Sequence, residues 1–457
     1  MIKLNLYNTI QRRLSIFQPI DTKNVRIYAC GPTVYDFIHI GNARPLVVFD
    51  VLVRLLRKIY PKVTYVRNIT DIDDKINKRA IEKKINISEL TNETIKNFHK
   101  DAHALGNLKP DFEPKATDHI SEMIEMIEKL ISNGFAYVSS GNVLFAVEKY
   151  NNYGALSGRS LDEMISGSRV EVAEYKKNPG DFILWKPSSE KLPGWDSPWG
   201  RGRPGWHIEC SAMSKKYLGT QFDIHAGGLD LIFPHHENEI AQSCCANKSD
   251  IMANYWLHNG YVTSDGEKMS KSLGNFTTIN NLLLNFRGEA IRYALMQAQY
   301  RAPLSFSKKS LDEATKSLSR LYRAVEGFEV NDGQDTQIID NLCDDLNSPK
   351  ALARLHYLAD EANKGSKECA QKLKNSSNIL GILCNSTDEW FKFGKINSNE
   401  AIENSTMTEK EIDELIIKRK IAKENKEYEK ADQIREQLLE KNIQLEDKPD
   451  RTVWRRL

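Results

Sequence analysis

The chain has 457 residues, which is too long for one ordinary domain and suits about three or four. Its formal net charge of +2 gives no overall basic field, so a nucleic-acid partner would need local basic patches. Seven thinly spread cysteines argue against a disulfide framework, and no apolar run is long enough to cross a bilayer. No signal peptide is evident. These features predict a reduced, cytoplasmic protein without a membrane partner.

The N-terminal part shows a strand–turn–helix–strand pattern. Residues 25–30 are predicted to form a buried strand that Gly31 and Pro32 break. A helix is expected from about Gly41, with Pro45 tolerated in its first turn, and the next strand at 63–66. Such a βαβ unit predicts a parallel sheet.

An inserted segment is predicted to follow this unit. Residues 117–131 carry apolar side chains at helical spacing, and Thr117 can cap that helix. The elements expected after it are a β-hairpin at 135–138 and 143–147, a loop rich in Gly, Pro and Trp at 193–206, and two strands at 222–225 and 255–262. The parallel sheet is therefore expected to be split across the sequence.

The pattern turns helical after about Leu311. One helix is expected behind Ser310, and another is expected to begin at Ser348-Pro349 by the cap-then-proline rule. The last segment, Glu409 to Leu457, contains 13 acidic and 13 basic residues. Most of that segment is predicted to be a solvated helical surface.

The first candidate motif is His39-Ile40-Gly41-Asn42, between the first strand and the first helix. The free N–H groups and dipole of a helix N-terminus suit a phosphate, and Gly41 lets a nucleotide approach the backbone. His39 and Asn42 add side-chain donors. Alone this tetrapeptide is a weak signal, because a histidine at a strand end is more often structural.

The second candidate motif is Lys268-Met269-Ser270-Lys271-Ser272. Two lysines beside small hydroxyl residues can neutralise charge that develops on a leaving pyrophosphate. An arbitrary lysine pair at this spacing is more often a solvated turn, but no G-x-x-x-x-G-K-[ST] segment offers a P-loop instead. Together the two motifs resemble the HIGH and KMSKS signatures of class I aminoacyl-tRNA synthetases. The first departs at Asn42, which replaces a histidine but keeps a hydrogen-bond donor.

Four potential metal ligands are scattered along the chain: Cys30, Cys210, His235 and Glu239. His235 and Glu239 are four residues apart and so share one helical face, whereas His236 would share its face with Ile240 and is not expected to ligate. Two thiolates, an imidazole and a carboxylate suit Zn²⁺. Because the four residues are scattered along the chain, their chemistry alone is compatible with a shared zinc site and equally with separate structural roles.

The segments around these residues resemble the motifs of the cysteinyl-tRNA synthetases. They are Cys30 to Asp36, Pro204 to Met213 and Phe233 to Glu239, and the resemblance runs from about residue 20 to the C-terminus. It implies one zinc ion per chain on Cys30, Cys210, His235 and Glu239. It also implies activation of L-cysteine with Mg-ATP and transfer to tRNA(Cys). Soft thiolate is a natural zinc ligand that serine cannot imitate, which would make an editing domain unnecessary.

The resemblance assigns further residues by motif. The implied sets are His39, Asn42, Lys268 and Lys271 for catalysis; His39, Asn42, Gly228, Asp230 and Lys271 for ATP; Gly31, Thr33, Thr70 and Trp206 for cysteine; and Trp454, Arg455 and Arg456 for tRNA. From the residues alone, Trp206 in a core, Asp230 in a turn and Trp454 in a frayed basic tail remain alternatives. The family's glycine before the Trp-Arg-Arg ending is replaced by Asp450-Arg451.

The expected fold is α/β: a split Rossmann-like parallel-sheet catalytic domain with an α/β insertion, then a helical bundle and a small C-terminal domain. The predicted boundaries are 1–115 and 205–265 for the catalytic domain, 116–204 for the connective insertion, 266–310 for the KMSKS loop and stem-contact region, 311–400 for the bundle, and 401–457 for an anticodon-binding domain. We expect a monomer.

Two other functions are compatible with parts of this pattern. One is a cysteine ligase of the mycothiol-biosynthesis type, which adenylates cysteine but lacks an anticodon domain; the region from Leu311 to Leu457 argues against it. The other is a non-catalytic paralogue that binds tRNA or senses zinc. The intact Lys268–Ser272 motif and the complete ligand set argue against that one.

Overall fold

The computed structural model describes residues 3–160, 163, 174–264, 267–268, 277–392, 407–447 and 452–456. The chain divides into two compact units. The first comprises Met1–Thr278, Leu295–Phe306 and Thr336–Leu352, and the second comprises Ile279–Ala294, Ser307–Asp335 and Ala353–Leu457. Among the described helices, none is both long and apolar enough to cross a membrane.

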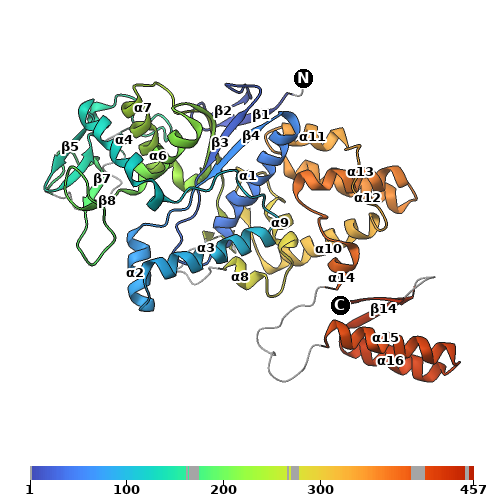
Figure 1. The fold of residues 1–457 in the computed structure, drawn as a ribbon. Coiled ribbons are helices and arrows are strands. Elements are labelled where there is room, and N and C mark those ends of the chain that lie inside the picture. The colour runs from blue at the N-terminus through green and yellow to red at the C-terminus, as the bar shows by residue number, and fades with distance from the viewer. Residues whose placement is uncertain are drawn as a thin grey trace. The chain divides into compact units, whose positions relative to one another are not determined.

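A four-stranded parallel sheet forms the centre of the first unit (Figure 1). Its order is β10 (Ala253–Asn259), β9 (Phe222–Gly228), β3 (Val25–Ala29) and β4 (Val63–Arg67). Two strands thus come from the N-terminal segment and two from beyond the insertion. This arrangement confirms the predicted split Rossmann-like sheet.

The two central strands create a switch point in the sheet. From β3 the chain passes through α1 (Ile40–Ile59) to β4 on one side, and from β9 it passes through α7 (Glu237–Asn247) to β10 on the other. Where neighbouring strands lead away in opposite directions, a crevice opens at their carboxyl ends. A ligand site is therefore expected where β3 and β9 end.

Helix α1 is anchored by a buried arginine. Arg44 is fully buried and donates hydrogen bonds to the carbonyls of Gly260 (2.9 Å), Tyr261 (2.8 Å) and Gln299 (3.2 Å). The helix begins at Ile40, so Pro45 is its sixth residue and lies beyond the first turn in which it was predicted. The start of α1 is thereby tied to the backbone that follows β10.

Strand β10 is shorter than predicted. The predicted strand at 255–262 ends at Asn259, and β11 (Val262–Ser264) belongs to a separate sheet of order β12-β11-β13, with β12 at Glu267–Lys268 and β13 at Leu304–Ser305. Gly260 separates the two strands, and a Cβ there would lie 2.5 Å from the carbonyl oxygen of Arg301. The chain changes sheets where only glycine fits.

The insertion contains a second, antiparallel sheet of four strands. Its order is β5 (Ala136–Ser139), β6 (Asn142–Phe145), β7 (Phe182–Pro187) and β8 (Gly202–Pro204), which confirms the predicted hairpin. Thr117 does not cap the neighbouring helix α4 (Ile120–Ser132) as predicted. Its backbone N–H and hydroxyl both donate to Asp71, and a short 3₁₀ turn, Ala116–His119, precedes α4 instead.

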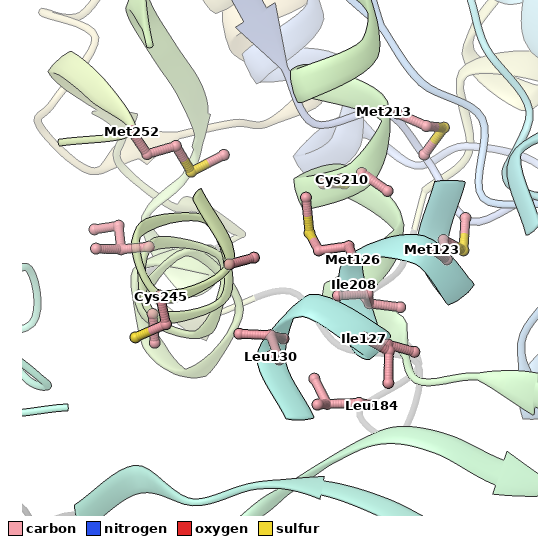
Figure 2. Packing of buried hydrophobic residues seen from close by; sticks show 14 of the residues in the cluster. Met123, Met126, Ile127, Leu130, Leu184, Ile208, Cys210, Met213, Cys245 and Met252 are labelled. Carbon is pink, nitrogen blue, oxygen red and sulfur yellow. The ribbon is translucent and has the colours of Figure 1, made fainter. Parts of the chain in front are cut away.

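An apolar core joins the insertion to the parallel sheet (Figure 2). Met126 and Leu130 of α4 pack with Ile208 and Met213 of α6 (Trp206–Leu218) and with residues of α7. Cys210 belongs to the same buried cluster. The helix that carries this thiol is therefore fixed from behind by a close-packed core, in which small displacements are resisted.

The remaining described elements are mostly helices. They are β1 (Asn5–Asn8), β2 (Arg13–Ile16), α2 (Asp74–Lys83), α3 (Ile87–Ala104), α8 (Ile279–Leu282), α9 (Gly288–Leu295), α10 (Lys308–Ala324), α11 (Thr336–Cys343), α12 (Ser348–Asn363), α13 (Lys367–Ser377) and α14 (Thr387–Phe391). The helix expected behind Ser310 begins at Lys308, and Ser307 caps it through a reciprocal hydrogen bond with Ser310. The helix predicted at Ser348-Pro349 is α12.

The C-terminal segment ends in strands that the charge pattern did not predict. Helices α15 (Glu409–Glu424) and α16 (Tyr428–Glu440) are followed by β14 (Ile443–Asp447) and β15 (Thr452–Arg456), which pair antiparallel. Arg419 of α15 forms a two-pronged ion pair with Asp447, at 2.8 and 2.9 Å, and so links the hairpin to the helix.

Trp454 is part of the core of this segment. Its side chain packs with Ile412, Leu438 and Leu445, and its indole N–H donates to Asp413 at 2.9 Å. With only 5% of the residue exposed, the ring cannot stack on an unpaired base as predicted. The prediction mistook an aromatic residue beside two arginines for a surface feature, because the strand that turns Trp454 inward was not foreseen.

Replacement of Trp454 by alanine should loosen this small core. Loss of a buried aromatic side chain costs about 3–5 kcal/mol. Backbone amides of residues 407–447 should therefore exchange with solvent much faster in Trp454→Ala, measured by hydrogen exchange and mass spectrometry. Ile421→Ala is the matched control, since that residue is half exposed. Equal protection in the two variants would contradict the buried role of Trp454.

Candidate functional site

A cavity of about 340 Å³ lies at the carboxyl ends of β3, β9 and β10. This is the place that the switch point indicates. The predicted site residues on its wall are Cys30, Gly31, Thr33, His39, Asn42, Trp206, Gly228 and Asp230. Lys271 lies outside the described residues, and Lys268 is described only as part of the backbone of β12.

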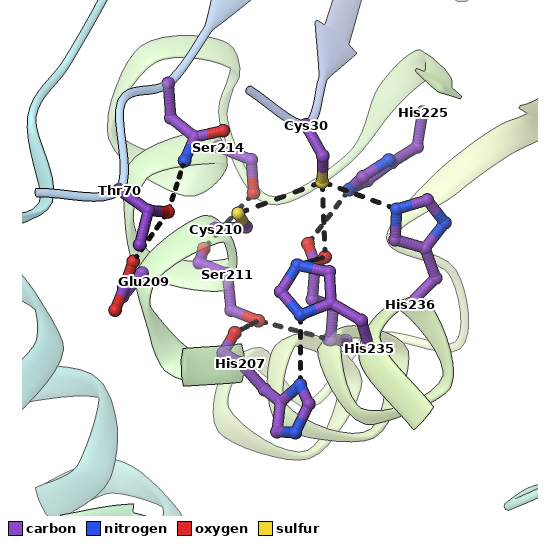
Figure 3. Close-up of polar contacts among 12 residues, drawn as sticks. Cys30, Thr70, His207, Glu209, Cys210, Ser211, Ser214, His225, His235 and His236 are labelled. Carbon is purple, nitrogen blue, oxygen red and sulfur yellow. Dashed lines mark hydrogen bonds and ion pairs between the residues drawn. The ribbon is translucent and has the colours of Figure 1, made fainter. Parts of the chain in front are cut away.

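The four predicted metal ligands come together beside this cavity, and Figure 3 labels three of them, Cys30, Cys210 and His235. Cys30 directly follows β3, Cys210 lies in α6, Glu239 lies in α7, and His235 lies in the single π-helical turn Ile232–His236 before α7. One donor atom from each lies within 4.8 Å of the others. Residues more than 200 positions apart thus meet in one cluster because the split sheet brings their elements together.

The distances within the cluster suit a cation. The Cys30 sulfur lies 3.8 Å from that of Cys210 and 3.7 Å from Glu239 Oε1. His235 Nε2 lies 3.0 Å from the same carboxylate oxygen. Two sulfurs, an imidazole nitrogen and a carboxylate oxygen form a donor set typical of zinc. The cluster can therefore hold a metal ion.

A second overlapping group includes a histidine that was not expected to ligate. Cys30, His225, His236 and Glu239 also offer donor atoms within 4.8 Å of one another, and His236 Nε2 is 3.3 Å from the Cys30 sulfur. His236 is three residues before Glu239, and residues at that spacing also share a helical face, whereas the sequence analysis compared His236 only with Ile240. That His236 does not ligate stays a prediction. Since both groups use Cys30 and Glu239, they describe one site with extra histidines around it.

Charges in this buried cluster are strongly coupled. Burial raises the pKa of Glu239, but His225 and His235 outweigh it and bring that pKa to about 2. A hydrogen bond from the Cys30 thiol lowers the pKa of Cys210 to about 6, although burial opposes this, while burial raises the pKa of Cys30 itself. Glu239 and Cys210 are thus poised as anions, and a cation that binds must displace the proton of Cys30.

Surrounding side chains orient the ligands. His225 Nε2 lies 2.9 Å from the second oxygen of Glu239, and His207 Nδ1 lies 3.0 Å from Nδ1 of His235. Such outer contacts fix the rings and carboxylates that bind a metal. His207 and His225 were not identified from the sequence. The only signal was the position of His207 three residues before Cys210.

A polar chain links the ends of β3 and β4 to α6. The backbone N–H of Gly31 donates to Asn68 Oδ1 at 2.8 Å, Asn68 donates to the Thr70 hydroxyl at 3.2 Å, and that hydroxyl donates to Glu209 at 3.0 Å (Figure 3). A Cβ on Gly31 would lie 1.6 Å from the carbonyl oxygen of Asn68. Gly31 therefore allows a close approach of two strands. Asn68 and Glu209 were missed by the sequence analysis.

The predicted substrate residues lie near this chain. Thr33 and Thr70 form an isolated parallel bridge, and the Trp206 ring stacks on His235 with their centres 4.1 Å apart. Trp206 is more than one-third exposed, so it forms a wall of the cavity and not part of the core.

His39 and Asn42 form the N-terminal cap of α1. The Asn42 N–H donates to His39 Nδ1 at 3.2 Å, and Asn42 Oδ1 accepts from the His39 N–H. This reciprocal capping explains how asparagine can occupy the fourth position of the motif. Gly228 is the last residue of β9 and Asp230 follows that strand, and both line the same cavity. The cavity is thus lined by a helix N-terminus and by a glycine-containing strand end, which suits a nucleotide.

Comparison with known proteins assigns the family. Residues 16–316 match the family described as tRNA synthetases class I (C) catalytic domain, and residues 337–385 match the DALR domain. A cysteine--tRNA ligase of Rhodospirillum rubrum is 50% identical over 99% of this chain and 99% of its own length. One of Gluconobacter oxydans is 52% identical over 99% and 98%. The chain belongs to the cysteine--tRNA ligase family.

A solved structure agrees with the fold of this family. Methionyl-tRNA synthetase of Mycobacterium tuberculosis in complex with methionyl-adenylate has a TM-score of 0.57 at 15% sequence identity, covering 78% of this chain and 89% of its own. At that identity the likeness concerns the fold alone.

Cys210→Ser should reduce the metal content of the purified protein. Serine oxygen is a poor replacement for thiolate as a zinc ligand. Inductively coupled plasma mass spectrometry should find about one zinc per wild-type chain and much less in the variant. Cys384→Ser is the matched control because Cys384 is exposed and lies far along the chain from the four ligands. Metal content unchanged by Cys210→Ser would remove Cys210 from the site.

Proposed function

We propose that this protein activates L-cysteine with ATP and transfers it to the 3′ end of tRNA(Cys). The observation that carries this proposal is the donor cluster of Cys30, Cys210, His235 and Glu239 directly beside the nucleotide-type cavity. A class I fold alone would not select an amino acid. The cluster supplies the chemistry that distinguishes a thiol from other small side chains.

We assign Zn²⁺ to this cluster, one ion per chain. When bound, zinc supplies a Lewis-acidic centre that favours a thiolate over a hydroxyl. Such a bond discriminates far more strongly than an apolar pocket, which separates near-isosteres poorly. The protein residues keep the site selective: His207 and His225 hold two of the ligands, and Trp206 closes one wall. Gly31, Thr33 and Thr70 are the proposed contacts of the rest of cysteine.

The reaction proceeds in two steps. The carboxylate of cysteine attacks the α-phosphorus of Mg-ATP, which gives cysteinyl-adenylate and pyrophosphate. A terminal hydroxyl of tRNA then attacks the acyl carbonyl, which gives the ester and AMP. His39 and Asn42 bind the phosphates at the start of α1, and Gly228 and Asp230 hold the adenosine. Catalysis rests on positioning and on charge stabilisation.

Lys268 and Lys271 are the proposed cationic clamp on the leaving pyrophosphate. Their segment follows β11 in the sequence, and β11 begins two residues after Gly260, to which Arg44 of α1 is bonded. Arg44 thus ties α1 to the backbone just before β11.

The rival functions are not favoured. The curated relatives match the chain over nearly its whole length, including the helical C-terminal part that a mycothiol-type cysteine ligase lacks. The ligand geometry is complete, which argues against a non-catalytic paralogue.

We retain the predicted domain boundaries and assign residues 401–457 to anticodon binding. Because Trp454 is buried, the groove between α15 and α16 is a better candidate surface than the chain end. This groove has a volume of about 360 Å³ and is lined by Lys418, Asn425, Lys430, Gln433 and Gln437, among others. Amide and ammonium groups can bind base edges and phosphates of an unpaired loop. Arg455 and Arg456 remain candidates for phosphate contacts.

We also infer a monomeric, cytoplasmic protein. All four proposed ligands and the cavity come from one chain, so one copy suffices for the site. None of the seven cysteines, all of which lie within the described residues, forms a disulfide, which is in keeping with a reducing compartment.

Exchange of pyrophosphate into ATP tests the function directly. It should depend on cysteine, should not be supported by serine, and should fall after treatment with a zinc chelator and recover when zinc is returned. Exchange that persists with serine, or that needs no amino acid, would exclude the proposed reaction.

A chain that ends at Thr408 should separate activation from transfer. Removal of Glu409–Leu457 takes away α15, α16 and the hairpin but none of the residues around the cavity. Cysteine-dependent exchange should therefore survive, while kcat/KM for tRNA in aminoacylation should fall at least tenfold. Undiminished tRNA charging would show that this segment does not read the anticodon.

A further inference from the structure

A second cavity lies on the other side of Trp206. Its volume is about 360 Å³, and Trp206 lines both this cavity and the first one. The remaining walls come from the start of α2 and from β7 and β8 of the insertion, with Tyr175 and Phe182 as further aromatic residues. Neither the predicted metal cluster nor the predicted ATP residues account for this cavity.

Two cations face each other across the strands of this cavity. Lys186 of β7 is directly opposite Arg203 of β8 in the antiparallel register. Like charges in directly opposite positions destabilise a sheet. An anion between the two cations removes that cost. Here the anion is the Asp74 carboxylate, which lies 2.6 Å from the Lys186 ammonium and 2.7 Å from the Arg203 guanidinium. The pair is therefore built around a negative charge.

The anion that occupies the pair is open to solvent. The Asp74 side chain is 62% exposed, whereas those of Lys186 and Arg203 are 27% and 11% exposed. Exposed ion pairs contribute little stability. Arg203 is also held by Ser188, whose hydroxyl accepts at 3.2 Å, so its guanidinium stays in place if Asp74 moves. Arg203 therefore has a second anchor, and Asp74 is the most exposed of the three side chains.

Other groups at this position also favour a phosphate. Asp74 is the first residue of α2, so the N-terminal N–H groups of that helix add positive potential. The two other carboxylates on the wall have partners of their own: Asp73 accepts from the Lys75 N–H at 2.7 Å, and Glu209 accepts from Thr70. The aromatic walls can stack on unpaired bases.

We propose that Lys186 and Arg203 bind a backbone phosphate near the single-stranded 3′ end of tRNA, and that Asp74 holds this pair until the nucleic acid displaces it. The inference rests on the proposed function, which requires a tRNA hydroxyl to reach the cavity beyond Trp206. A phosphate of ATP has the same chemistry. It is disfavoured as the ligand because the ATP residues line the other cavity.

The test compares Lys186→Gln with Asp74→Asn in the full-length protein. Lys186→Gln should raise the KM for tRNA about tenfold, the effect of losing one charged hydrogen bond. It should also reduce the slope of log KM for tRNA against log salt concentration by about 0.7–1. Asp74→Asn should lower the KM for tRNA about two- to fivefold, because it removes the competing anion. The KM values for cysteine and ATP in pyrophosphate exchange should stay within about twofold in both.

The matched controls are Lys216→Gln and Glu122→Gln. These residues form a partly exposed ion pair between α6 and α4, and neither lines a cavity described above. Both control variants should keep the wild-type KM for tRNA.

The opposite signs expected for the two site variants make the proposal falsifiable. If Asp74→Asn raises the KM for tRNA or leaves it unchanged, the three residues form a structural clasp and the proposal is wrong. An unchanged KM for tRNA in Lys186→Gln would also overturn it. A change in the KM for ATP would assign the phosphate to the nucleotide instead. Failure of the wild-type protein to charge tRNA while exchange is intact would reject the proposed function itself.

Discussion

The site depends on one constraint: donor atoms from four separate elements must stay within 4.8 Å of one another inside the protein. Burial of two sulfurs, a carboxylate and several imidazoles would cost folding free energy if no compensating charge were present. The histidines supply part of that compensation, and they bring the pKa of Glu239 to about 2. A bound cation would complete it, and the site is therefore arranged around a positive charge.

The fold maintains this constraint through packing behind each donor. Cys30 follows a central strand of the parallel sheet, and Cys210 belongs to the apolar core shared by α4, α6 and α7. Arg44 links the start of α1 to the backbone after β10. The same switch point thus places the donor cluster and the cavity side by side. Both are needed to join a thiol-bearing amino acid to a nucleotide.

Much of this arrangement could be predicted from the sequence. The βαβ pattern and the split sheet were predicted correctly, because strands and helices leave local signals. The four proposed ligands lie together, as the family resemblance implied, although their scatter along the chain gave no local signal. Other features have no local signal. His225 reaches the cluster from β9 through the tertiary fold. His236, by contrast, is three residues before Glu239, a helical spacing that the sequence analysis overlooked.

The C-terminal segment shows the same limit. Balanced charge predicted a solvated helical surface, yet a hairpin closes over a small core and buries Trp454. Burial of one aromatic residue depends on which strand face it occupies, and this cannot be read from a run of charged residues. Thr117 likewise bonds to Asp71, which is remote in sequence, and therefore does not cap α4.

Zinc K-edge X-ray absorption on the zinc-loaded protein tests the central claim most directly, namely that cysteine is selected through its sulfur at this cluster. Addition of L-cysteine should increase the sulfur scattering at about 2.3 Å, the usual zinc–sulfur distance, whereas serine at the same concentration should not. An unchanged sulfur shell with saturating cysteine would contradict the account, because the substrate thiol would then be recognised without the metal.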